Sequence, residues 1–103
     1  MIQATIKFHR NNGLPHYLSI EVLGHAPNNN VCAVISAASM TLNSILEHNP
    51  GYEVHVSAGD LRLFNIGCEE ADYDRFLEFY VALMKWLYEN FKGCFNSFSI
   101  AEE

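Results

Sequence analysis

His25 and Cys32 lie close together in the segment GHAPNNNVCAVIS, residues 24–36, and their residue types can do chemistry. A thiolate is a strong nucleophile, and a neighbouring imidazole can take the thiol proton, so the pair suits attack on a carbonyl carbon. The alternative is a turn histidine beside a small core residue, because free cysteine is usually buried and inert. The residue types alone leave both interpretations open.

The elements around the pair predict where each side chain lies. Gly24 ends an alternating segment, the asparagines of PNNN are suited to capping a helix, and Val31 begins an apolar series with helical spacing. Cys32 then falls in the first helical turn, where the positive end of the helix dipole favours a thiolate. We therefore expect both side chains at one end of a sheet.

The predicted helix also indicates which way the thiol points. At about 3.6 residues per turn, Cys32 lies about a quarter turn from the apolar stripe, on a strip with Ser36, Ser39 and Asn43. We interpret this strip as the floor of a groove. Backbone N–H groups around Cys32 and Ala33 are expected to be free in this turn and able to bind the oxygen of a tetrahedral intermediate. The position suits acyl transfer.

Periodicity over the rest of the chain predicts the remaining elements. Strands and helices are expected, in chain order, over residues 2–8, 18–22, 31–46 (helix), 52–57, 61–66, 72–91 (helix) and 95–100. Turn signals, NNG and AGD, join the strands of each hairpin. The order ββαββα with a final strand predicts a two-layer α+β fold, with a mostly antiparallel sheet packed against two helices.

Length and composition limit the class of protein. A chain of 103 residues that is 50% hydrophobic predicts one domain, residues 1–103. Because no signal-like start and no run of about 18 apolar residues occurs, we expect a cytoplasmic protein with no membrane partner. The net charge of −6 argues against direct nucleic-acid binding and favours protein or peptide partners.

The other cysteines and histidines give no sign of a metal site, since zinc needs three or four ligands within reach. Residues of these types without ligand spacing are Cys68, Cys94, His9, His16, His48 and His55. We interpret them as incidental, and we expect no metal and no other cofactor. The three thiols are expected to be reduced. The acidic stretch CEEADYD, residues 68–74, is interpreted as a solvated helix start.

The segment 24–26 (GHA), followed by 31–33 (VCA) and Ser36, resembles the paired motif of the ribosomal-processing cysteine protease family, often called Prp. The resemblance extends over nearly the whole chain in length and order of elements. It implies an α+β homodimer that removes a short N-terminal extension from a ribosomal protein of the large subunit; phage-linked relatives are associated with capsid or scaffold maturation. It also implies that Cys32 is the nucleophile, His25 the base and Ser36 a supporting residue.

The chain departs from the family in the loop between the two motif halves. Family members usually carry a longer, glycine-rich segment with an aspartate shortly before the cysteine, whereas only residues 26–31 stand here. Asn29 occupies about the place of that aspartate, where its amide would orient His25. Helix capping is the alternative role for the asparagines. A shorter loop is expected to change which substrates reach the thiol.

One flank of the second predicted helix carries Phe79, Leu83 and Trp86 outside the main apolar stripe. This surface is wider than one sheet contact needs, so it predicts either extra burial within the chain or the interface of a homodimer.

Two function classes follow from the sequence. The first is a cysteine endopeptidase that trims a precursor, either a ribosomal protein or a phage capsid or scaffold protein. The second is a catalytically weak or inactive dimeric peptide-binding module on the same fold. The pair His25 and Cys32 favours the first class, and the short loop of residues 26–31 favours the second.

Overall fold

The computed structural model describes residues 1–58 and 60–103. Its elements are, in chain order, β1 (Ile2–Asn11), β2 (Leu14–Leu23), α1 (Asn29–Leu46), β3 (Tyr52–Ser57), β4 (Asp60–Asn65), α2 (Ala71–Asn90), a short 3₁₀ turn (Lys92–Cys94) and β5 (Phe95–Glu102). The predicted order of elements, including the final strand, is confirmed. Within the described ranges no helix combines the length and the apolar character that a membrane crossing requires.

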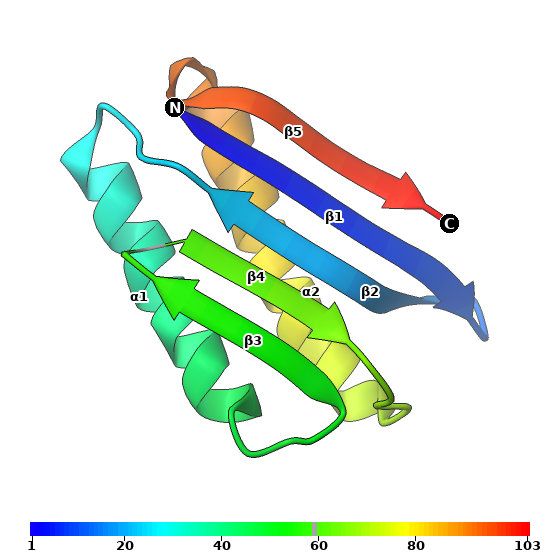
Figure 1. The fold of residues 1–103 in the computed structure, drawn as a ribbon. Coiled ribbons are helices and arrows are strands. Elements are labelled where there is room, and N and C mark those ends of the chain that lie inside the picture. The colour runs from blue at the N-terminus through cyan, green and yellow to red at the C-terminus, as the bar shows by residue number, and fades with distance from the viewer. Residues whose placement is uncertain (59) are drawn as a thin grey trace.

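The five strands form one sheet in the order β3-β4-β2-β1-β5. Neighbouring strands are antiparallel except for β5, which pairs in parallel with β1. The sheet is therefore mixed, with one parallel pair, and the α+β class is confirmed. Both helices cover the same face of the sheet, so the fold has two layers (Figure 1).

The hairpin between β1 and β2 turns where the sequence predicts. Asn12 (φ 56°) and Gly13 (φ 79°) both adopt left-handed backbone conformations, which a two-residue hairpin turn of this kind requires and which asparagine and glycine tolerate best. A β-bulge follows, since Lys7 pairs with Ser19 while the next residue pairs with Tyr17. The bulge interrupts the predicted alternation of β2, and Tyr17 is buried while Leu18 is only half-buried.

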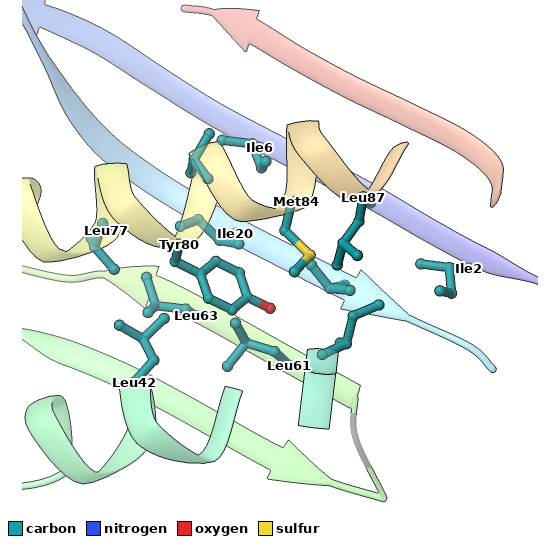
Figure 2. Packing of buried hydrophobic residues seen from close by; sticks show 14 of the residues in the cluster. Ile2, Ile6, Ile20, Leu42, Leu61, Leu63, Leu77, Tyr80, Met84 and Leu87 are labelled. Atoms are coloured by element: carbon teal, nitrogen blue, oxygen red, sulfur yellow. The ribbon is translucent and has the colours of Figure 1, made fainter. Parts of the chain in front are cut away.

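The core lies between the sheet and the helices, as Figure 2 shows. Aliphatic side chains from all three central strands meet the inward faces of α1 and α2. Those with exposed fractions of 3% or less include Ile6, Ile20, Leu61, Leu63, Leu42, Leu77, Met84 and Leu87. Full burial of each such side chain contributes about 1.5–3 kcal/mol. This core fixes how the helices lie on the sheet, and so it also fixes the positions of the ends of the helices and strands.

Ser39 corrects the predicted polar strip on α1. It is completely buried, and its hydroxyl lies 3.0 Å from the phenol oxygen of Tyr80 on α2. A hydroxyl is tolerated in the core when it has such a partner. Ser39 is therefore part of the helix–helix contact and not of a groove floor.

Asp74 and His16 correct two further interpretations. Asp74 was expected at a solvated helix start, but it is only 4% exposed. Its Oδ2 lies 2.8 Å from Nδ1 of His16, and its Oδ1 accepts the N–H of Tyr17 at 3.1 Å. His16 is thus a buried partner rather than an incidental residue. The pair ties the first turn of α2 to the start of β2, because a buried carboxylate needs such donors.

Candidate active site

The start of α1 is organised by Asn28. Its side-chain oxygen accepts the backbone N–H groups of Asn30 at 2.9 Å and Val31 at 3.3 Å. These groups have no partner within a helix, so a capping side chain stabilises the start of the helix by about 1 kcal/mol. The prediction that the asparagines cap this helix is confirmed, and the cap places Cys32 in the first turn.

The sulfur of Cys32 is held against the loop that enters the helix. The backbone N–H of Ala26 donates to Sγ at 3.1 Å, and the thiol donates to the Ala26 carbonyl at 3.4 Å. Cys32 is half-buried and packs against the core, yet it also lines a surface pocket. A backbone donor beside the sulfur can stabilise negative charge there.

Three of the predicted site residues meet in one small pocket. His25, Cys32 and Ser36 line it together, and the remaining walls are Ile2, Gly24, Ile35 and Ala58. His25 is exposed, and within the described residues no hydrogen bond joins its ring to Cys32. Catalytic hydrogen bonds are often long before substrate binds, so this geometry is compatible with a base that approaches the thiol on binding.

Gly24 is required at the edge of this pocket. Its φ of +99° lies in the region that favours glycine, and an added Cβ would stand 2.2 Å from the carbonyl oxygen of Met1. The start of β1 therefore packs directly against the residue that precedes His25. Only a residue without a side chain allows this close approach.

Asn29 and Ala33 do not line the pocket with His25 and Cys32. Both are exposed, and the cap of α1 is the neighbouring Asn28. The expectation of a free N–H at Cys32 is wrong, because this group donates to the carbonyl of Asn28 at 3.2 Å. Cys32 stands four residues after the cap residue Asn28, so its N–H makes an i to i−4 hydrogen bond with the carbonyl of that residue.

Asp60 does not line the pocket, but it bonds the backbone beside it, a contact that sequence reasoning missed. Its Oδ1 accepts the backbone N–H of Gly24 at 3.0 Å, across 36 positions of the chain. Asp60 opens β4, and Ala58 of the same hairpin lines the pocket. No local pattern signals this contact, since it arises only when the β3–β4 hairpin packs beside the end of β2.

The other two cysteines lie in different surroundings. Cys68 and Cys94 are 6% and 7% exposed, whereas Cys32 is half-buried at a pocket. In the described part of the chain no three His, Cys, Asp or Glu side chains are grouped so that they could hold a metal ion. Cys32 is thus the cysteine that a ligand in the pocket would meet.

The apolar flank of α2, residues Phe79, Leu83 and Trp86, was expected either to be buried within the chain or to form a dimer interface. Phe79 is 77% exposed and Trp86 is 55% exposed, so extra burial within the chain does not account for them. Phe79 and Leu83 of this flank, but not Trp86, line an apolar groove between the two helices, whose other lining residues are Val34, Ala37, Ala38, Thr41, Leu42, Ile45, Phe76 and Tyr80.

Comparisons with known proteins place the fold. No protein-family model matches the sequence, and no curated protein sequence matches it significantly. Among solved structures, SMU.848 from Streptococcus mutans is 23% identical, with a TM-score of 0.72 over 100% of this chain and 99% of that one. The essential ribosomal processing protease Prp from S. aureus, solved with a covalently linked product peptide, is 14% identical, with a TM-score of 0.71 over 100% of both chains. The chain thus has the fold of a ribosomal processing protease along its full length.

Proposed function

We propose that this chain is a cysteine endopeptidase that removes a short N-terminal segment from a precursor protein, with Cys32 as nucleophile and His25 as base. The observation that carries the proposal is that both side chains line one pocket at the start of α1. The shared fold with a ribosomal processing protease supports it. The proposed active unit is the chain 1–103 as one domain, with Ser36 as a supporting residue of the pocket.

The chemistry follows from the groups at hand. Neutral His25 takes the thiol proton, and the thiolate of Cys32 attacks the peptide carbonyl carbon. The carbon–nitrogen bond then breaks, His25 gives its proton to the departing amine, and a thioester remains on Cys32. Water, deprotonated by His25, attacks the thioester and releases the acid and the free thiol. These steps need no metal and no cofactor.

The proposed substrate is a peptide segment of a ribosomal protein of the large subunit. The similar protease from S. aureus was solved with a covalently linked product peptide, which supports a peptide ligand here. A phage capsid or scaffold protein is the second candidate. Three unpaired cysteines support a reducing compartment such as the cytoplasm as the place of action.

The alternative function is peptide binding without turnover. Two observations favour it: the ring of His25 is exposed and not bonded to Cys32, and the loop of residues 26–31 between them is short. Such a module would bind the same segment and leave it intact. Binding and cleavage therefore have to be measured separately.

We also propose that two copies associate through the outer face of the helices. The centre of this face is the groove lined by residues of α1 and by Phe76, Phe79, Tyr80 and Leu83 of α2, and none of the residues that line it is charged. Because the chain carries a net charge of −6, copies repel least where an uncharged surface meets its equivalent. Phe79→Glu is expected to convert a dimer to a monomer in light scattering, whereas Ile66→Glu, at a residue 62% exposed outside this face, should not.

The test of the proposed function is cleavage of candidate precursors by the purified protein. Unprocessed large-subunit ribosomal proteins and phage capsid or scaffold proteins are incubated with wild type, Cys32→Ala and His25→Ala, and the products are read by mass spectrometry. The expected result is a shortened precursor with wild type only. Binding of a precursor by wild type with no cleavage would favour the peptide-binding module, and neither binding nor cleavage would refute both.

A further inference from the structure

We propose that Asp60 is a positioning residue of the Cys32–His25 site. Its carboxylate accepts the Gly24 N–H at 3.0 Å and so fixes the backbone that carries His25. This inference rests on the proposed function. It assigns a role to a residue on β4 that stands far from the histidine–cysteine segment in the sequence.

The geometry places His25 between two anchored amides. On one side, the N–H of Gly24 donates to Asp60; on the other, the N–H of Ala26 donates to Sγ of Cys32 at 3.1 Å. The imidazole itself has no hydrogen-bond partner within the described residues, and it is exposed. The direction of the ring relative to the sulfur therefore depends on how firmly its own backbone is held.

Gly24 makes such an anchor necessary. Glycine has the freest backbone of all residues, and this position excludes any side chain because a Cβ would meet the Met1 carbonyl at 2.2 Å. The chain cannot stiffen this residue by substitution. Contacts from outside the segment therefore restrict it: the Met1 backbone packs against it, and Asp60 supplies a hydrogen bond to its N–H.

The hairpin that holds Asp60 also contributes to the pocket. Asp60 pairs with Ser57 at the end of the β3–β4 ladder, and Ala58 lines the pocket beside Cys32. Ala58 therefore supplies a wall of the pocket, and Asp60, two positions later, supplies the anchor of the loop. A displacement of about 1 Å in such a group can reduce the rate about a hundredfold, because reacting atoms must be aligned.

The test compares Asp60→Ala with Asp60→Asn, whose amide oxygen can accept the same hydrogen bond. Asp72→Ala serves as a control, because Asp72 is an exposed acidic residue in the first turn of α2. We expect kcat to fall at least tenfold in Asp60→Ala with KM changed less than threefold, and to recover to within threefold of wild type in Asp60→Asn. Asp72→Ala should retain the wild-type rate.

Two readouts separate a positioning role from a general loss of structure. Amide hydrogen exchange at Gly24 should accelerate in Asp60→Ala and not in Asp60→Asn. The rate of Cys32 alkylation should likewise differ from wild type in Asp60→Ala and not in Asp60→Asn. Wild-type kcat in Asp60→Ala, or no recovery in Asp60→Asn, would overturn the inference. If wild type cleaves no precursor, the proposed function fails independently, and equal Cys32 alkylation rates in all variants would then overturn the inference.

Discussion

The backbone amide of Ala26 donates a hydrogen bond to the sulfur of Cys32 at 3.1 Å, so the residue after His25 is joined to the thiol itself. Because Cys32 lies in the first turn of α1, this bond links the loop, the helix and the pocket. The short connection between the two proposed catalytic residues thereby becomes part of the site. It brings His25 and Cys32 to one pocket.

The exposure of the three thiols predicts selective modification. Cys32 is half-buried at a pocket, while Cys68 and Cys94 are 6% and 7% exposed, so iodoacetamide should alkylate Cys32 at least tenfold faster in the folded protein. Peptide mapping of a time course measures the three rates. In denaturant the three rates should converge, which serves as the control. Equal rates in the folded protein would contradict the described burial.

Gly24→Ala should destabilise the protein more than Gly13→Ala does. Both glycines have positive φ, +99° and +79°, so an alanine costs about 1–2 kcal/mol of strain at either position. At Gly24 the new Cβ also displaces the Met1 backbone, whereas at Gly13 it meets nothing within 4 Å. We expect about 1 kcal/mol more loss for Gly24→Ala in urea unfolding. An equal loss in the two variants would show that the close approach to Met1 has no energetic weight.

The buried phenol of Tyr80 leads us to expect a loss of stability at high pH. Burial raises the pKa of Tyr80 to about 12, while its hydrogen bond to Ser39 acts weakly in the opposite direction. In the unfolded chain a tyrosine has a pKa of about 10. Between these pH values the unfolded state loses a proton that the folded state keeps. The contribution of the protonated Tyr80 phenol to the free energy of unfolding is therefore full below pH 10 and is lost as the pH rises towards 12.

The measurement is the free energy of unfolding in urea from pH 9 to 11.5. Its decline above pH 10 should be shallower in Tyr80→Phe than in wild type, since that variant has no phenol to ionise. A decline of the same steepness in both proteins would assign the alkaline loss to other groups.

Asp74→Ala should destabilise the protein by about 1–3 kcal/mol for each buried group that it leaves without an acceptor, His16 and the N–H of Tyr17. Asp72→Ala provides the matched control, since it removes a carboxylate from the same helical turn at an exposed position. There the loss should stay within about 1 kcal/mol, the usual weight of an acidic residue near a helix start. Equal losses in the two variants would contradict a structural role for the buried pair.

Local signals account for what could be predicted from the sequence. The NNG turn, the asparagine cap of α1 and the alternating strands each depend on neighbouring residues, and so does the placement of Cys32 in the first helical turn. These signals were sufficient for the order of elements. They also placed His25 and Cys32 at the same end of the sheet, where the pocket lies.

The missed contacts join residues that are distant in the chain. His16 meets Asp74 across 58 positions, and Gly24 meets Asp60 across 36, so neither contact leaves a periodic trace. The bulge at Leu18 changes which side chains of β2 are buried, and alternation cannot anticipate an inserted residue. Polar contacts of this kind depend on the packed sheet and helices, which only the three-dimensional structure supplies.

The central claim is that Cys32 is the nucleophile of a protease. The most direct measurement is the cleavage rate of one precursor by wild type, Cys32→Ala and Cys94→Ala. Cys94→Ala, at a buried thiol away from the pocket, controls for the loss of a cysteine. We predict cleavage by wild type and Cys94→Ala and none by Cys32→Ala. Cleavage by Cys32→Ala at the wild-type rate would contradict the claim.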